Sequence, residues 1–285
     1  MLLERFDSLL EFLARFPREH ARDSTFYRFV EGVAKYAFRE AKPQFEAGLG
    51  VPFAELGTLY LPYEKMGAID SIDLFGLDEL LMFAFYYCNR DRYARAADIG
   101  ANIGLHSILL SRCGMKTEAF EPDPQHHAKL LRNLQLNGVT DCTAHMAAVS
   151  ESKGKMEFVR VLGNTTSSHL AGAKANPYGD LERFEVDVCD VREIAARVDF
   201  MKIDAEGHEG VLLNAISVEQ WKDTDAFVEV GTPQNATTIL KRFAHTGINV
   251  FSQKTGWGRV ESITQMPSSY KEGGIFVSSK AVMPW

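Results

Sequence analysis

Two clusters of polar residues in this chain could do chemistry, and each adjoins a short apolar segment. The first is Asp98-Ile99-Gly100-Ala101-Asn102-Ile103-Gly104, and the second is Asp199-Phe200-Met201-Lys202-Ile203-Asp204-Ala205-Glu206-Gly207-His208-Glu209. Small apolar residues precede the first cluster, and apolar residues at helical spacing follow it. A strand, a glycine turn and a helix in that order gather backbone N–H groups and a helix N-terminus at one point. Because glycine also lets a ligand approach the backbone closely, this cluster predicts a site for the polar part of a nucleotide-like ligand.

The carboxylate of Asp98 indicates which ligand that site suits. A dinucleotide site has the spacing G-x-G-x-x-G and offers its helix N-terminus to a pyrophosphate. Here Gly100 and Gly104 follow the spacing G-x-x-x-G, and Asp98 precedes the first of them. A carboxylate at this point repels phosphate and attracts a cation. S-adenosylmethionine carries an ammonium and a sulfonium but no phosphate, so it fits better than a pyrophosphate coenzyme.

A second acid and a run of small residues complete the expected cofactor site. Residues 116–120 predict a strand that leads into Glu121, which is placed to accept hydrogen bonds from both hydroxyls of a ribose. Ala147, Ala148 and Val149 end a third expected strand, where an adenine ring could lie flat. The competing explanation is a glycine turn with two solvated acids.

The second cluster supplies the candidate catalytic residues. Residues 200–203 predict a strand, and ligands of open α/β sheets bind beyond the carboxyl ends of the strands. We expect Asp204 to be the general base, His208 the alternative base, and Glu206 the group that binds acceptor hydroxyls or orients the base. Helix capping competes with these roles, and with any role of Glu209, because acids favour a first helical turn. Three acids and a histidine could also hold a divalent metal, but their spacing fits no strict ligand motif, and we predict none.

Alternating strands and helices must position both clusters. We expect strands at 95–99, 116–120, 143–149, 200–203 and 226–230, helices at 103–112, 125–137 and 234–246, and a closing antiparallel hairpin of 248–251 with 274–277. This alternation implies a parallel sheet with helices on both faces. Between two further β-like segments, 156–161 and 182–188, lies the polar loop 163–176, in which His169 is expected at the surface.

The first 90 residues contain no pattern that suggests chemistry. Apolar stripes at 2–13 and 26–37 predict two helices, short β-like pieces follow at 58–61 and 66–69, and a buried helix is expected at 77–88. We therefore expect an N-terminal, mainly helical accessory region over 1–75 and the main domain over 76–285. The N-terminal helices are expected to pack on the main domain. A lid over the substrate pocket or a homodimer contact are the alternatives.

Composition limits the classes of function. The chain has 285 residues, 46% of them hydrophobic, which is enough for an α/β core and an accessory region. A formal net charge of −7 argues against an extended nucleic-acid surface, which would need a basic stripe. No uncharged apolar run approaches the roughly 18 residues of a membrane span, and the N-terminus lacks signal-peptide layout. The four cysteines are far apart, as expected for reduced thiols in a cytoplasmic protein.

Taken together, four motifs resemble the FkbM-family methyltransferases, a branch of the class I S-adenosylmethionine-dependent enzymes. They are DIGANIGLHS at 98–107, FEPDP at 120–124, LLRNLQLNG at 130–138 and MKIDAEGHE at 201–209. The first alone would indicate only a class I methyltransferase, and the fourth, at its distance from the first, makes the resemblance fairly specific. The motifs span roughly 95–230, about half of the chain, so the substrate stays open.

The resemblance implies a fold, a reaction and a cofactor site. The fold would be a Rossmann-like, seven-stranded α/β sheet with its last strand antiparallel. Asp98, Gly100, Asn102 and Gly104, with Ala101 in the same turn, would line the methionine part of the cofactor, and Glu121 the ribose. The reaction would be O-methylation of a hydroxyl on a sugar or natural-product small molecule. A methyltransferase acting on RNA or protein and a non-catalytic cofactor-binding protein are the alternatives, and an NAD-dependent oxidoreductase is disfavoured by Asp98.

Overall fold

The computed structural model describes residues 8–174 and 179–285. In these ranges the α-helices are α1 (Leu9–Ala14), α2 (Thr25–Glu46), α3 (Leu77–Cys88), α4 (Leu105–Arg112), α5 (Pro124–Leu136), α6 (Val191–Ala195), α7 (Glu209–Ala215) and α8 (Pro233–Phe243). The strands are β1 (Val51–Pro52), β2 (Thr58–Leu59), β3 (Arg95–Ile99), β4 (Lys116–Phe120), β5 (Cys142–His145), β6 (Ala148–Ser150), β7 (Gly154–Val161), β8 (His169–Leu170), β9 (Leu181–Asp190), β10 (Phe200–Ile203), β11 (Asp225–Glu229), β12 (Asn249–Ser252), β13 (Gly258–Arg259) and β14 (Gly274–Ser278).

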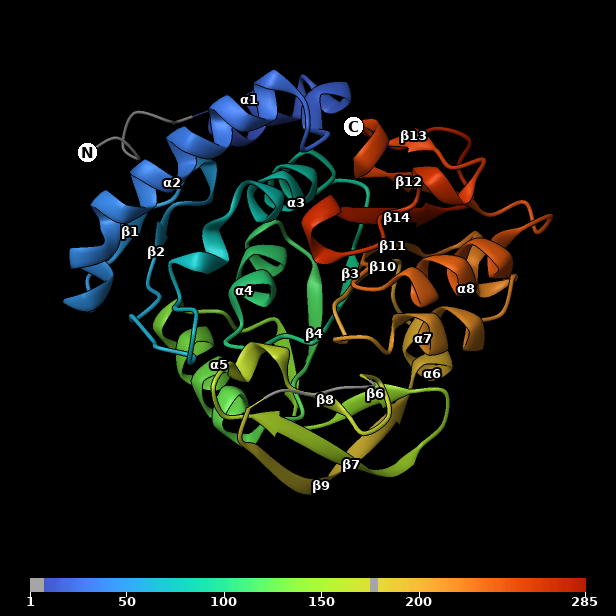
Figure 1. The fold of residues 1–285 in the computed structure, drawn as a ribbon. Coiled ribbons are helices and arrows are strands. Elements are labelled where there is room, and N and C mark those ends of the chain that lie inside the picture. The colour runs from blue at the N-terminus through green and yellow to red at the C-terminus, as the bar shows by residue number, and fades with distance from the viewer. Residues whose placement is uncertain (1–7, 175–178) are drawn as a thin grey trace.

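The main sheet runs through the centre of the molecule (Figure 1). Among the described residues it has eight strands in the order β13-β12-β14-β11-β10-β3-β4-β5. Strands β5, β4, β3, β10 and β11 are parallel, whereas β14 is antiparallel to both β11 and β12. The α/β class and the antiparallel last strand are therefore confirmed. The two-residue β13 pairs with β12 at the edge and adds one strand to the seven expected.

Both faces of this sheet are covered, because alternate residues of a strand point to opposite sides. Phe200 and Phe227 pack into the apolar layer that contains α3 and α4, and Met201 and Val228 pack into the layer of α7 and α8. Burial on both faces explains why the parallel strands are apolar without alternation. The chain passes from β3 to β4 on one side and returns to β10 on the other, so the strand order reverses beside β3. Ligands of such sheets bind at this reversal.

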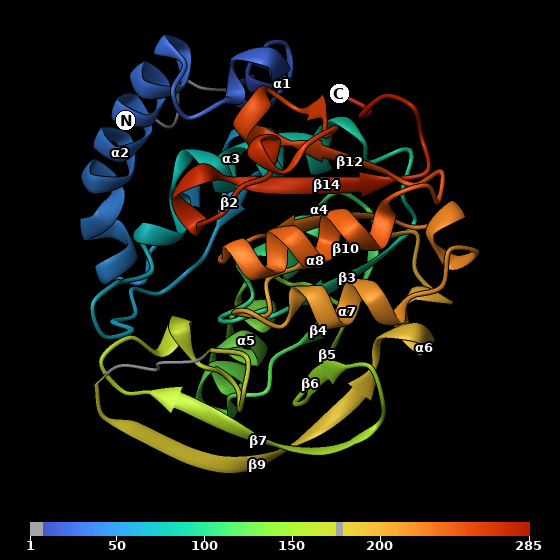
Figure 2. The ribbon, with the colours of Figure 1, turned by 45° about the vertical axis from the view of Figure 1, so that its right-hand side comes forward.

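A second sheet lies next to β5, the edge strand of the main sheet, and is seen below the main sheet in Figure 2. In the described residues it has four strands in the order β6-β9-β7-β8. The expected third strand, 143–149, is thus wrong as one element: β5 stays in the main sheet, and β6 pairs with β9 instead. The β-like segments at 156–161 and 182–188 form the long antiparallel pair β7–β9. Most of the polar loop 163–176 joins β7 to β9 and contains β8, while residues 175 and 176 lie outside the described ranges.

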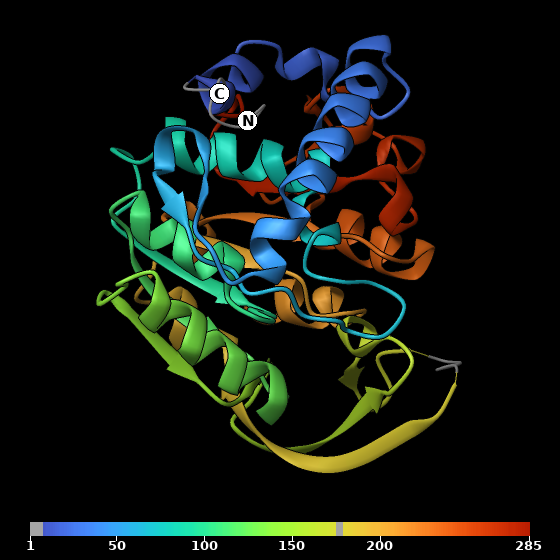
Figure 3. The same cartoon turned by 90° about the vertical axis from the view of Figure 1, so that its left-hand side faces the viewer.

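The N-terminal region packs on the outside of α3 (Figure 3). Ser24 caps α2 by accepting the Tyr27 N–H. Phe38 and Phe45 of α2 belong to the same apolar cluster as Phe83 of α3. The expected first stripe begins at residue 2, but residues 1–7 lie outside the described ranges. We retain the division near residue 75 as a proposal. No helix within residues 8–174 and 179–285 is long and apolar enough to cross a membrane.

Candidate active site

A cavity of about 720 Å³ lies where the carboxyl ends of the central strands face the second sheet. This volume falls within the range of roughly 300–1,000 Å³ that is usual for ligand pockets. Its lining combines strand ends of the main sheet with the segment that follows β7. The predicted residues on its wall are Gly100, Asn102, Glu121, Ala148, Asp204 and Glu206. Ala101 lines a second cavity of about 50 Å³ behind the turn.

The glycine turn after β3 has no room for a side chain at its first position. Gly100 has φ 79°, and a Cβ there would lie 1.8 Å from the carbonyl oxygen of Asp204. Asn102 has φ 52°, which is uncommon for a non-glycine residue, and its N–H donates to Glu121 Oε2 at 2.8 Å. Gly104 lines neither cavity, and a Cβ there would lie 2.4 Å from Leu130 Cδ1. Gly104 therefore allows α4 to pack against α5.

Asp98 lies beneath the turn and not on the cavity wall. Its side chain is fully buried, and Oδ2 accepts a hydrogen bond from Ser107 Oγ at 2.6 Å. Its Oδ1 is 3.7 Å from Lys202 Nζ. The expected direct attraction of a cationic ligand by Asp98 therefore needs correction, because Lys202 already balances part of this charge. Asp98 is linked to the turn through Lys202, because the Nζ of Lys202 also lies 3.2 Å from the carbonyl oxygen of Gly100.

No role was predicted for Lys202 from the sequence. A lysine inside an apolar strand indicates a buried, paired charge, because an unpaired buried charge is costly. Its buried Nζ lies 3.2 Å from the carbonyl oxygen of Gly100, 3.4 Å from Asp204 Oδ2 and 3.7 Å from Asp98 Oδ1. Burial alone would lower the pKa of Lys202, but the carboxylates of Asp204 and Asp98 raise it, so the side chain is a cation. One positive charge therefore joins the first cluster to the second.

Asp204 and Glu206, two of the acids in the second cluster, differ in their electrostatics. Burial opposes the charge of Asp204, but Lys202 prevails and lowers the pKa of this carboxyl. Burial and the neighbouring Asp204 raise the pKa of Glu206 to about 7, although Lys174 opposes the shift. Glu206 also has φ 52°, a backbone strain of roughly 1–3 kcal/mol of the kind found at functional sites.

His208 is directed toward Ser150 and not into the cavity. It does not line the cavity, and its Nε2 is 2.9 Å from Ser150 Oγ. We therefore do not retain His208 as the alternative base. Glu209 is a structural acid: its Oε1 accepts the N–H groups of Ala205 and Gly207, each at 3.0 Å, and so holds the turn that carries Glu206.

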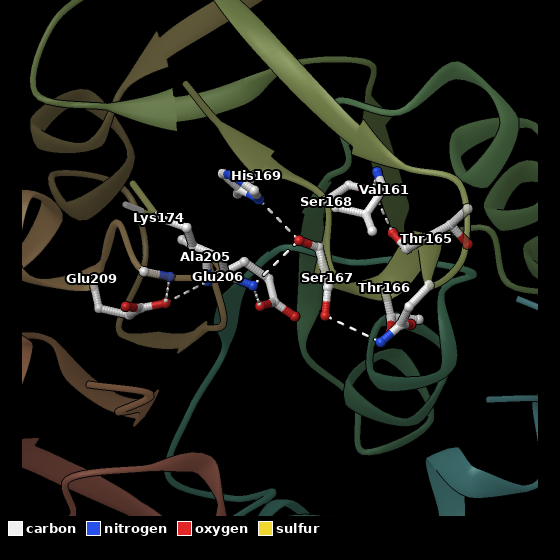
Figure 4. Close-up of polar contacts among 12 residues, drawn as sticks. Val161, Thr165, Thr166, Ser167, Ser168, His169, Lys174, Ala205, Glu206 and Glu209 are labelled. Carbon is white, nitrogen blue, oxygen red and sulfur yellow. Dashed lines mark hydrogen bonds and ion pairs between the residues drawn. The ribbon is translucent and has the colours of Figure 1, made fainter. Parts of the chain in front are cut away.

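A segment of the second sheet covers the cavity, and we call residues 164–174 the strap. Lys174 donates to the carbonyl of Ser167 and forms an ion pair with Glu206, which ties the strap to the turn after β10 (Figure 4). His169 is only 2% exposed and lines the cavity, so the expected surface position is wrong. Its Nδ1 is 2.9 Å from the carbonyl oxygen of Ser167. Periodicity could not reveal this placement, because it depends on how the second sheet sits over the first.

Glu121 and Glu229 are two further acids that line the cavity. Glu121 accepts the N–H groups of Asn102 and Asp123, each at 2.8 Å, and burial raises the pKa of its carboxyl to about 8 against these bonds. Glu229, at the end of β11, lines the cavity beside Asp204. Glu229 had no predicted role, although it ends a strand just as Glu121 follows one.

The decisive comparison is with protein families. Residues 98–253, more than half of the chain, match the model of the methyltransferase FkbM domain. The chain belongs to the FkbM methyltransferase family. The match contains the glycine turn, Glu121, the second sheet and the cluster around Asp204. The cofactor of the FkbM domain is S-adenosylmethionine.

Relatives of the FkbM domain include two curated proteins. One, "Methyltransferase 1" of Beauveria bassiana (strain ARSEF 2860), is 27% identical over 154 residues, and the match covers 46% of this chain. The other, "Methyltransferase sdnD" of Sordaria araneosa, is 30% identical over 161 residues and covers 44% of this chain. The chain spans 61% of the length of each relative. Among solved structures, an O-methyltransferase from Bacillus cereus in complex with SAH aligns at a TM-score of 0.37 and 10% identity, covering 69% of this chain and 77% of that one.

The cavity of the FkbM domain fits S-adenosylmethionine by its donors and charges. Asn102 Oδ1 is buried without a hydrogen-bond partner among the described residues, and Asn102 lines the cavity, so this oxygen could accept from an ammonium. The wall in residues 8–174 and 179–285 includes one lysine, Lys174, and no arginine, which suits a cofactor without phosphate. Ala147 and Ala148 leave room for a flat ring. Within the described ranges, no three His, Cys, Asp or Glu residues are grouped as metal ligands.

Proposed function

We propose that this protein is an S-adenosylmethionine-dependent O-methyltransferase that modifies a hydroxyl of a small molecule, a sugar or another natural product. When bound, the cofactor supplies an electrophilic methyl group on a sulfonium. The residues of the chain must then align the acceptor oxygen and accept its proton. Alignment alone can contribute up to about 7–11 kcal/mol to lowering the barrier of a two-reactant step.

The observation that carries this proposal is the state of Glu206. It lines the cavity on a strained backbone, and its pKa of about 7 matches what a general base needs near neutral pH. Asp204 was the expected base, but the lowered pKa of its carboxyl makes it a weak proton acceptor. We therefore assign the proton to Glu206 and give Asp204 the role of orienting the acceptor hydroxyl. A positioned base accelerates such a step by roughly 10²–10⁴-fold.

The polar side chains of the strap favour an acceptor that carries hydroxyl groups. Thr165, Thr166, Ser167 and His169 line the cavity opposite the cofactor turn and bring hydroxyl and imidazole groups to its wall. Groups of this kind recognise hydroxyls by hydrogen bonds, because each hydroxyl both donates and accepts. An extended anionic polymer would need several cations, and Lys174 is the one lysine on the described wall. RNA is therefore the less favoured acceptor.

The test combines binding and product analysis. Purified protein should gain thermal stability with S-adenosylhomocysteine and none with NAD or RNA, because a ligand that binds only the folded state stabilises it. Incubation with S-adenosylmethionine and a panel of glycosides and polyketide alcohols should yield a product heavier by one methylene in mass spectrometry. Stabilisation by NAD alone would contradict the assignment of S-adenosylmethionine as the cofactor. Detection of methylated RNA or protein would show that the acceptor is a macromolecule.

A homodimer through the N-terminal helices remains a prediction. Phe29 and Tyr36 on α2 are 71% and 58% exposed, which leaves aromatic surface available for such a contact. Sedimentation of the protein, compared with a variant carrying Phe29→Ser and Tyr36→Ser, would test it. A wild-type monomer would contradict the dimer.

A further inference from the structure

Asp204 and Glu229 stand side by side at the ends of neighbouring parallel strands. β10 and β11 pair with Ile203 opposite Val228, so the next residues along the two strands are Asp204 and Glu229. Both side chains line the main cavity. The topology alone therefore brings two carboxyl groups together on the cavity floor.

One oxygen of Asp204 lacks an ordinary donor. Its Oδ2 is 3.4 Å from Lys202 Nζ. The buried Oδ1 accepts no hydrogen bond from an amide, ammonium or hydroxyl group within the described part of the chain. Buried carboxylate oxygens in folded proteins are nearly always hydrogen-bonded. The Glu229 carboxyl is in hydrogen-bonding contact with Asp204, and two carboxyl groups can share a hydrogen bond only if one of them carries a proton.

The surrounding charges decide which carboxyl holds that proton. The charged groups that interact with Glu229 are Asp204 just after β10, Glu206 on the same turn, Glu79 on α3 and the cation Lys202 on β10. Burial and Asp204 raise the pKa of Glu229 well above its usual range. For Asp204 burial acts in the same direction, but Lys202 at 3.4 Å prevails and lowers the pKa of Asp204. The proton therefore belongs on Glu229.

We propose that Glu229 is a neutral positioning residue that donates a hydrogen bond to Asp204 and thereby fixes the carboxylate that orients the acceptor. The role of Asp204 in this statement rests on the proposed function, whereas the protonation of Glu229 does not. With this proton bound to Glu229, the net charge of four side chains together is −1, which favours a cationic cofactor. The four are Asp98, Lys202, Asp204 and Glu229. Ionisation of Glu229 would break the hydrogen bond and place two carboxylates in contact.

The first experiment needs no acceptor and compares Glu229→Gln with the wild type by thermal unfolding at a series of pH values. An unfolded chain releases this proton near pH 4.5, the ordinary pKa of glutamate, but the folded protein holds it to a much higher pH. The wild type therefore loses stability as the pH rises from about 5 toward 9, whereas glutamine has no proton to lose. The Tm of Glu229→Gln relative to the wild type should rise steadily over this range. A constant deficit, or failure of the variant to fold, would overturn the proposal.

The second experiment uses an acceptor found by the product screen and adds Glu229→Met, which keeps the length but removes the donor. Glu229→Gln should retain turnover within about threefold, whereas Glu229→Met should lose at least about tenfold in kcat. The fall of wild-type kcat at alkaline pH should vanish in Glu229→Gln. Loss of turnover in Glu229→Gln equal to that in Glu229→Met would contradict a neutral donor. If no acceptor is found, the proposed function fails, and the Tm series still decides the protonation of Glu229.

Discussion

Arg160 and Asp123 form a buried, two-point ion pair that joins the second sheet to the segment after β4. The Nε of Arg160 is 2.6 Å from Oδ2 of Asp123, and its Nη2 is 2.7 Å from Oδ1. Asp123 also accepts the N–H of Gln125 at the start of α5, and its own N–H donates to Glu121. The sheet that carries the strap is thus fixed relative to the residue expected to bind the ribose.

Replacing Arg160 by methionine should destabilise the protein by about 3–5 kcal/mol in urea unfolding, because it leaves the Asp123 carboxylate buried and unpaired. Arg183 on the same sheet pairs with Glu157, but their side chains are 49% and 50% exposed, so Arg183→Met is a matched control. Its effect should stay within about 0.5 kcal/mol. Equal effects of the two variants would show that the buried pair does not stabilise the contact between the second sheet and the segment after β4.

Gly100→Ala should abolish binding of S-adenosylhomocysteine in calorimetry. The new Cβ would meet the Asp204 carbonyl oxygen at 1.8 Å, so the turn or β10 must shift. Gly114→Ala separates this clash from backbone strain, because Gly114 has φ 84° but nothing within 4 Å of a Cβ. That control should lose about 1 kcal/mol of stability and keep its affinity. Normal affinity in Gly100→Ala would mean that the turn does not bind the cofactor.

Glu206→Gln should lower kcat by roughly 10²–10⁴-fold and leave the affinity for S-adenosylhomocysteine unchanged. In the wild type, kcat/KM should rise with pH through about 7, since a base must be deprotonated and the pKa of Glu206 is about 7. Pre-steady-state and pH-rate measurements would check both points, with the exposed Glu185→Gln as control. Retained turnover would return the role of base to Asp204.

Asp98→Ala should weaken S-adenosylhomocysteine binding at least about tenfold, because Lys202, which also contacts the Gly100 carbonyl of the turn, loses one of its two carboxylates. Asp98→Asn separates charge from hydrogen bonding, since an amide oxygen can still accept from Ser107. Intermediate affinity of Asp98→Asn in titration calorimetry is expected. Affinity like that of the wild type in both variants would show that the charge of Asp98 does not influence cofactor binding.

Local patterns were sufficient for much of the fold. The apolar run at 77–88 and the segment at 200–203 match α3 and β10 at both ends, because each is long or apolar enough to be set by its own residues. The split between β5 and β6 was not visible, since no Gly or Pro interrupts residues 142–150 and only the second sheet decides where β6 pairs.

The sequence by itself determined the two clusters, their positions after strands, and the resemblance that identified the family, since spacing along one chain is enough for each. Only the tertiary structure decided what each side chain faces. It buried Asp98 against Lys202, turned His208 toward Ser150 and brought His169 and Glu229 to the cavity. Contacts between residues distant in the chain depend on how the sheets pack, and burial together with neighbouring charge then sets each protonation state.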